Sequence, residues 1–116
     1  MNILFLCTSN LQRSPTAQEL FETLDPSHVY RSAGLSEKYV KKAGTTLCSE
    51  DTLSWADRIY VFEQNHIDRI QKYTGDLFIS KIFNLDIQDE YQYFQMELIL
   101  ILLERIKKLG HLTTIS

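Results

Sequence analysis

Short apolar runs alternate with segments of helical character along most of this 116-residue chain. The apolar runs are residues 1–6, 29–33, 58–62 and 78–85. The segments with helical periodicity or helix-start signals are residues 14–24, 49–56, 64–73 and 94–109. Such apolar runs are typical of strands buried on both faces. Their alternation with helices predicts an α/β fold, with a parallel sheet between two layers of helices.

The composition fits one globular domain that spans residues 1–116. Hydrophobic residues make up 44% of the chain and charged residues 23%, an ordinary balance for a folded protein. The formal net charge of −3 argues against a broad surface for nucleic acid. The longest apolar run, residues 98–103, is too short to cross a membrane. No basic region precedes residues 3–6, so we expect no signal peptide and a cytoplasmic protein.

The two cysteines, Cys7 and Cys48, are expected to be free thiols, because no secretion signal accompanies them. A zinc site needs about four ligands, usually in closely spaced pairs. The histidines are scattered and supply no such pairs: His28, His66 and His111. We therefore expect neither a metal nor a cofactor. His66 follows the third apolar run, which leaves a place near the site open, but we favour a position on the surface of the next helix.

The turn that follows the first apolar run, residues 7–15, has the features of an anion site. Open parallel sheets bind ligands at the carboxyl ends of their strands. A loop that enters a helix can direct backbone N–H groups at an anion. Arg13 can donate to two phosphate oxygens, and Cys7 in such a positive environment would form a nucleophilic thiolate. Ser14 is expected as the N-cap of the helix and Pro15 as its first residue.

Two further side chains of this turn have expected roles. Ser14 is expected to donate its hydroxyl to the sulfur of Cys7, and Asn10 to hold a left-handed backbone conformation. The predicted phosphate-binding residues, called the phosphate loop below, are Thr8, Ser9, Asn10, Leu11, Gln12, Arg13 and Ser14. Cys48 has Ser54, not arginine, six residues later, so we interpret it as a structural thiol.

The pattern Cys7-x-x-Asn10-x-x-Arg13-Ser14-Pro15 resembles the signature of the low-molecular-weight protein tyrosine phosphatases. The family pattern is Cys-x5-Arg-Ser/Thr near the N-terminus. The likeness continues through the Ser-Ala-Gly of residues 32–34 and through residues 49–63.

The resemblance implies a single phosphatase-like domain, a three-layer αβα sandwich whose four parallel strands have the order 2-1-3-4. It also implies hydrolysis of a phosphomonoester through a phosphocysteine at Cys7, with Arg13 stabilising the transition state and no metal. The implied substrate is phosphotyrosine on a protein or a similar small aryl phosphate, and the loop would also hold inorganic phosphate or another oxyanion.

This sequence lacks the Asp-Pro-Tyr/Phe loop that supplies the general acid in the family. Two aspartates are candidates in its place. Asp86 directly follows the last predicted strand, and its distance to the last helix slightly favours it. Asp89 has the closer local likeness, as Asp-Glu-Tyr in place of Asp-Pro-Tyr.

The substrate walls also differ from the family pattern. Residues 35–48 are short relative to relatives, which leaves Tyr39 as the local candidate for one aromatic wall, with Tyr91 and Tyr93 as candidates for the opposite wall. Gln12 stands where many relatives have a second cysteine. The protective disulfide is therefore expected to be absent and Cys7 to be open to oxidation.

Other functions remain open at this point. The altered acid loop is compatible with a non-catalytic phosphate-binding regulatory module. An arsenate reductase on the same fold would need two further cysteines, and only Cys48 is present. A serine phosphatase with the same loop is a third alternative. The apolar helix at residues 96–109 would permit a homodimer, and no nucleic-acid or membrane partner is expected.

Overall fold

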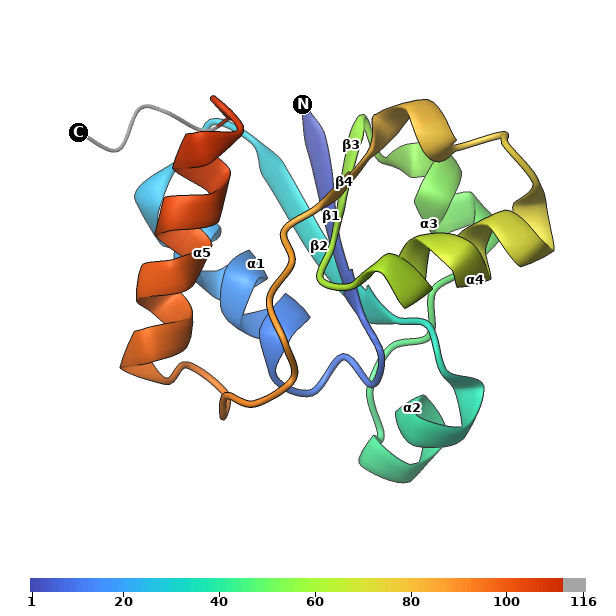
Figure 1. Ribbon diagram of the computed structural model, residues 1–116, viewed down its shortest axis with the longest axis horizontal. Helices are drawn as coiled ribbons and strands as arrows, with labels where there is room; N and C mark the ends of the chain where they lie inside the picture. Colours follow the sequence, from blue (N-terminus) through green and yellow to red (C-terminus); the bar gives the residue numbers. More distant parts are fainter. Residues whose placement is uncertain (112–116) are drawn as a thin grey trace.

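The computed structural model describes residues 1–111 and contains a four-stranded parallel sheet of order β2-β1-β3-β4 (Figure 1). The strands are β1 (Asn2–Cys7), β2 (Val29–Gly34), β3 (Arg58–Val61) and β4 (Ile82–Asn84). The parallel pairing and the strand order predicted from the sequence are confirmed.

The helices form the two outer layers of the sandwich. They are α1 (Arg13–Leu24), α2 (Glu37–Ala43), α3 (Glu50–Trp55), α4 (Gln64–Thr74) and α5 (Met96–Lys108), with a short 3-10 helix η1 (Ile79–Lys81) before β4. Figure 1 shows α1 and α5 on one side of the sheet, and α3 and α4 on the other. In the same view α2 lies near the carboxyl end of the sheet. No helix in the described part of the chain is long and apolar enough to cross a membrane.

Strand β1 runs through the centre of the molecule and is buried on both faces. Ile3, Phe5 and Cys7 belong to the core shared with α1 and α5. Leu4 and Leu6 belong to the core shared with α3 and α4. This alternation follows from the two-residue period of a strand. It places Cys7 at the carboxyl end of the sheet, on the side from which α1 begins.

Two local predictions are wrong. The run at residues 78–85 is not one strand, because Lys81 N donates to Phe78 O at 3.1 Å and closes a turn before β4. Ser14 is not the N-cap of α1 and Pro15 is not its first residue, because α1 begins at Arg13 with Gln12 as its N-cap, two residues earlier than predicted. The hydroxyl of Ser14 is engaged inside the phosphate loop instead.

Candidate active site

The sulfur of Cys7 lies at the start of the phosphate loop, 3.0 Å from the hydroxyl oxygen of Ser14. Asn10 Nδ2 donates to the same oxygen at 2.8 Å. The amide of Asn10 occupies a lone pair of that oxygen, and the hydroxyl hydrogen has two acceptors within reach, the sulfur of Cys7 and, at 3.5 Å, the backbone oxygen of Ala33. Ser14 can therefore donate to Cys7 when the sulfur is a thiolate, which has no hydrogen to give.

The backbone of the phosphate loop is fixed at Asn10, whose φ of 56° lies in the left-handed region. Asparagine adopts this conformation more readily than most residues. Its Oδ1 accepts from the backbone N–H of Thr46 at 3.4 Å. Thr45 Oγ1 donates to the backbone oxygen of Ser9 at 2.5 Å. The segment after α2 thus supports the loop from outside, and the predicted conformation of Asn10 is confirmed.

Gly34, the last residue of β2, allows the loop to approach the sheet. A Cβ atom at this position would lie 2.9 Å from the backbone carbon of Ser9 and 2.9 Å from the oxygen of Thr8. Both are backbone atoms that cannot move aside. A larger residue would therefore displace the phosphate loop.

The guanidinium of Arg13 is buried, with 1% of the residue exposed. Its Nη1 donates to Glu63 Oε2 at 2.7 Å and to the backbone oxygen of Ile87 at 2.8 Å. Its Nε is also buried and has no hydrogen-bond acceptor among residues 1–111. The carboxylate of Asp89 lies 3.8 Å from Nε, beyond hydrogen-bonding distance. Because buried N–H groups are almost always paired, this nitrogen is suited to an oxyanion.

His66 lies against the phosphate loop and not on the surface, so the expected surface position is wrong. It is fully buried, its Nδ1 accepts from Phe62 N at 3.2 Å, and its Nε2 lies 3.1 Å from Thr8 Oγ1. An accepting Nδ1 assigns the ring proton to Nε2, which then donates to Thr8. Burial, together with the positive charge of Arg13, lowers the pKa of His66 to about 4. The ring is therefore neutral at neutral pH.

Glu63 was not predicted as a site residue, and a place near the site was the less favoured alternative for His66. Glu63 lies in the turn after β3 and His66 in the first turn of α4, at the same sheet edge as the phosphate loop, and this position is the signal that could have identified them. His66 also precedes Ile70 by four residues, which puts both on the buried face of α4.

The two candidate acids lie in different surroundings. Asp89 lies beside Arg13, and its side chain is 54% exposed. Asp86 has a φ of 54° and lines a hollow together with Arg105 and Lys108, near the end of α5. The structure thus brings Asp89 to the phosphate loop and does not show Asp86 there. The intervening Ile87 is buried, with its N–H donating to Phe62 O at 2.9 Å.

No family model matches the chain, and no curated protein matches its sequence. Solved structures, in contrast, match over nearly its whole length. The low molecular weight protein tyrosine phosphatase from Streptococcus pyogenes aligns with a TM-score of 0.75 at 14% identity, covering 97% of this chain and 93% of that chain. The chain has the fold of the low-molecular-weight protein tyrosine phosphatases. The fold implied by the resemblance at residues 7–15 is confirmed.

Two other solved structures with the low-molecular-weight phosphatase fold are similar. Vibrio vulnificus Wzb in complex with benzylphosphonate aligns with a TM-score of 0.76 at 18% identity, covering 94% of this chain and 96% of that chain. The YwlE arginine phosphatase from Geobacillus stearothermophilus aligns with a TM-score of 0.71 at 24% identity, covering 94% of this chain and 92% of that chain.

Of the three tyrosines predicted as aromatic walls, Tyr93 lines the hollow beside the phosphate loop, and Tyr39 and Tyr91 do not. Tyr39 projects from α2, with the ammonium of Lys38 5.7 Å from its ring centroid, and Tyr91 packs against the core under α5. The hollow is lined by Leu11 and Tyr93 together with Pro15 and polar neighbours. Leu11 and Tyr93 are 49% and 48% exposed. Within the low-molecular-weight phosphatase fold, this chain therefore presents Leu11 and Tyr93 beside the loop.

Gln12 connects the phosphate loop with the segment at residues 85–95, called the acid segment below. When the side-chain amide of Gln12 is oriented with its nitrogen toward the two nearby acceptors, Nε2 lies 3.1 Å from the backbone oxygen of Tyr91 and 3.2 Å from Asp89 Oδ1. Thr16 Oγ1 adds a second link, since it donates to Gln12 O at 2.6 Å and accepts from Phe94 N at 2.9 Å. Asp89 is thus held at the edge of the loop.

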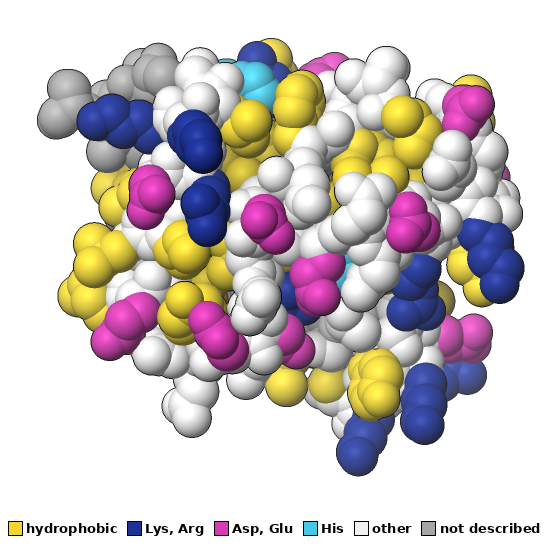
Figure 2. Space-filling model, viewed as in Figure 1, with side chains coloured by type: hydrophobic (Ala, Val, Ile, Leu, Met, Phe, Trp, Pro, Cys, Tyr) yellow, Lys and Arg dark blue, Asp and Glu magenta, His cyan; other side chains and the backbone are white. Residues whose placement is uncertain are grey.

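Charge around the loop comes from α2 as well as from Arg13. Figure 2 shows Lys and Arg side chains gathered at the lower right, over α2, whose sequence contains Lys38, Lys41 and Lys42. This helix begins beside the loop, because Ser36 N donates to Thr8 O at 3.0 Å. The lysines add positive potential, which attracts anionic substrates.

The second thiol, Cys48, lies apart from this chemistry. It follows a bridge between Gly34 and Leu47, and burial alone raises the pKa of Cys48 to about 12. A thiol with that pKa is protonated at neutral pH and is a poor nucleophile. Among residues 1–111, no three His, Cys, Asp or Glu side chains come together as a candidate metal site.

Proposed function

We propose that this protein is a phosphomonoester hydrolase that forms a phosphocysteine at Cys7. The observation that carries the proposal is the state of Arg13, which is buried and fixed through Nη1 while its Nε has no acceptor in the described chain. A tetrahedral oxyanion in the loop would satisfy this nitrogen and the loop N–H groups together.

In the first step, the thiolate of Cys7 attacks phosphorus in line with the ester oxygen. The S–P bond forms and the P–O bond to the leaving group breaks. Asp89, in its acid form, gives its proton to the departing oxygen. Arg13 and the N–H groups of the loop stabilise the negative charge on the equatorial oxygens. Ser14 stabilises the thiolate before attack through the contact at 3.0 Å.

In the second step, the carboxylate of Asp89 takes a proton from a water molecule, whose oxygen attacks phosphorus. The new P–O bond forms and the S–P bond breaks, which releases inorganic phosphate and restores the thiolate of Cys7. The sulfur leaves as an anion, and the hydroxyl of Ser14 is placed to stabilise it. All groups required for both steps come from this chain, so we propose that no metal takes part.

We propose an aryl phosphate, such as phosphotyrosine, as the substrate. Leu11 and Tyr93 support this proposal, because they expose apolar surface beside the loop on which an aromatic ring can pack. The similar Wzb structure from Vibrio vulnificus, which contains benzylphosphonate, provides further support.

Phosphoarginine is the second candidate substrate. The likeness to the YwlE arginine phosphatase favours it, since that protein aligns over 94% of this chain. A guanidinium leaving group would need an acidic partner near the phosphate loop, and Asp89 is the carboxylate beside Arg13.

The test is hydrolysis of p-nitrophenyl phosphate, a phosphotyrosine peptide and a phosphoarginine peptide, with EDTA present, by the wild type and by Cys7→Ala. We expect the wild type to hydrolyse the two aryl phosphates and Cys7→Ala to hydrolyse neither. Hydrolysis of the phosphoarginine peptide alone would identify phosphoarginine, the second candidate, as the substrate. Binding of inorganic phosphate without turnover of any ester would favour a regulatory module and contradict the proposal.

A further inference from the structure

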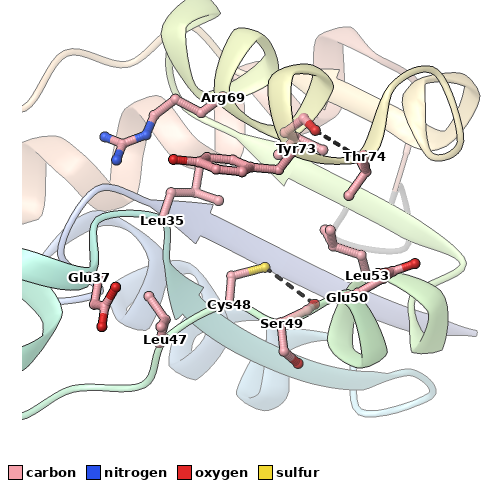
Figure 3. Close-up of a pocket in the computed structure, with 11 residues that line it drawn as sticks. Leu35, Glu37, Leu47, Cys48, Ser49, Glu50, Leu53, Arg69, Tyr73 and Thr74 are labelled. Atoms are coloured by element: carbon pink, nitrogen blue, oxygen red, sulfur yellow. Dashed lines mark hydrogen bonds between the residues drawn. The ribbon is translucent and has the colours of Figure 1, made fainter.

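A groove lies between α4 and the chain that joins α2 to α3 (Figure 3). Its apolar lining consists of Leu35, Leu47, Cys48, Leu53, Ile70 and Tyr73. Figure 3 shows Arg69 and Tyr73 on one side, Glu37 and Leu47 on the other, and Cys48 between them. Because the thiol of Cys48 is protonated, the floor of the groove is uncharged.

The two walls of the groove adjoin segments that contact the phosphate loop. Leu35, in one wall, donates its backbone N–H to the backbone oxygen of Cys7 at 2.9 Å, so this wall lies next to the residue proposed as the nucleophile. The other wall is α4, whose His66 contacts Thr8 at 3.1 Å. Ile70 follows His66 by four residues on the same helical face, about one turn or 6 Å along the axis. The groove therefore begins about one helical turn from the residues that contact the loop.

Two charged side chains stand at opposite ends of the groove. Figure 3 shows Arg69 near the end that begins at Leu35, and Glu50 at the far end beside Leu53. Within residues 1–111, neither Arg69 nor Glu50 has a hydrogen bond or an ion pair through its charged group. An occupant with an apolar group, an acceptor near Arg69 and a cation near Glu50 would match this arrangement.

We propose that the groove binds an apolar side chain of a phosphorylated protein substrate, with a lysine or arginine next to it facing Glu50. An extended peptide advances about 3.3 Å per residue. The apolar residue is then about two to four positions from the phosphorylated one, with the basic residue beyond it. Arg69 is left to donate to a backbone carbonyl of the peptide. This inference rests on the proposed phosphatase function and adds the recognition of a protein segment to it.

The experiment uses phosphotyrosine peptides in which a leucine, followed by a lysine, is moved through the positions on either side of the phosphotyrosine. We expect one placement to raise kcat/KM of the wild type about tenfold, because a leucine side chain is partly buried. Leu47→Asp, at the exposed edge of the groove, is expected to abolish the preference. Glu50→Lys is expected to shift the preference from lysine to glutamate at the adjacent position.

The matched controls are Leu100→Asp and Glu104→Lys, at exposed positions of α5 across the sheet. They are expected to keep the wild-type preference, and all four variants are expected to hydrolyse p-nitrophenyl phosphate at the wild-type rate. If the wild type hydrolyses p-nitrophenyl phosphate but its kcat/KM for the peptides does not depend on the position of the leucine, the groove proposal alone is overturned. A wild type inactive on every ester would overturn the proposed function itself.

Three other outcomes would also overturn the groove proposal. The first is a peptide preference that survives in both Leu47→Asp and Glu50→Lys. The second is dimerisation in solution that Leu47→Asp abolishes, measured by light scattering, which would assign the groove to a second copy of the chain. The third is an equal loss of activity on p-nitrophenyl phosphate and on peptides in Leu47→Asp, which would show that the groove only supports the fold.

Discussion

Glu63 Oε2 lies 2.7 Å from Arg13 Nη1 and joins the turn after β3 to the phosphate loop, across a separation of 50 residues. Arg13 is buried, so its positive charge must be stabilised inside the protein, by this carboxylate and by the backbone oxygen of Ile87. The two hydrogen bonds hold the Nη1 end of the guanidinium and leave Nε without an acceptor among residues 1–111. Glu63 is therefore a positioning residue for Arg13, and its removal has two measurable consequences.

We expect Glu63→Ala to lower the free energy of unfolding by about 3 kcal/mol, because a buried charge loses its partner. We also expect kcat/KM for p-nitrophenyl phosphate to fall about a hundredfold, since a misplaced guanidinium no longer meets the transition state. Urea denaturation and steady-state kinetics measure the two effects. Glu104→Ala is the control, because Glu104 faces Arg105 at 4.0 Å on the surface, where a pair contributes less than about 1 kcal/mol. Equal losses in both variants would contradict the role of Glu63.

The choice between the two candidate acids gives a second prediction. Asp89→Asn is expected to lower kcat for phenyl phosphate about a hundredfold or more, because the poor leaving group needs a proton. The effect on p-nitrophenyl phosphate is expected to be smaller, since its phenolate leaves more easily. Asp86→Asn, the matched control, is expected to leave both rates unchanged. The reverse pattern, with Asp86→Asn impaired and Asp89→Asn active, would exclude Asp89 as the acid.

The two thiols are predicted to differ in reactivity. The pKa of Cys48 is about 12, so at neutral pH only about one molecule in a hundred thousand carries its thiolate. Iodoacetamide is expected to label Cys7 first in the native protein, as peptide mass spectrometry would show. Ser14→Ala is expected to slow this labelling about tenfold, because the thiolate loses a hydrogen bond. Faster labelling of Cys48 than of Cys7 would contradict this account of the two environments.

His66 predicts a specific dependence of stability on pH. Its pKa is lowered from 6.5 to about 4 by burial and by Arg13, so the folded protein binds this proton less readily than the unfolded chain. Stability is therefore complete above pH 6.5 and is lost as the pH falls towards 4, by about 3 kcal/mol. His66→Gln keeps a donor but cannot titrate, so its loss across the same range is expected to be smaller. Urea midpoints measured across this range for both proteins test the difference, and parallel curves would exclude His66 as the titrating group.

The layers of the fold could be predicted because they depend on local patterns. A strand buried on both faces must be apolar throughout, and β1 is. The phosphate loop could be predicted for the same reason, since Cys7, Asn10, Arg13 and Ser14 lie within one turn of chain. Their internal contacts in the structure, from Ser14 to both Cys7 and Asn10, follow from that short separation.

The remaining features of the site depend on contacts between distant segments. Glu63 reaches Arg13 only because β1 and β3 are neighbours in the sheet. Asp89, and not Asp86, reaches the loop because the left-handed backbone at Asp86 and the burial of Ile87 set the path of the acid segment. No spacing in the sequence encodes that path. The predicted walls, Tyr39, Tyr91 and Tyr93, stay untested as substrate contacts.

The covalent intermediate provides the most direct test of the central claim. Wild-type protein would be mixed with p-nitrophenyl phosphate, denatured within one turnover, and digested for mass spectrometry, with Cys7→Ala treated in parallel. The account predicts one phosphoryl group on the peptide that contains Cys7, and none on any peptide of Cys7→Ala. Turnover of the substrate by the wild type without a phosphoryl group on Cys7, or turnover by Cys7→Ala, would contradict it.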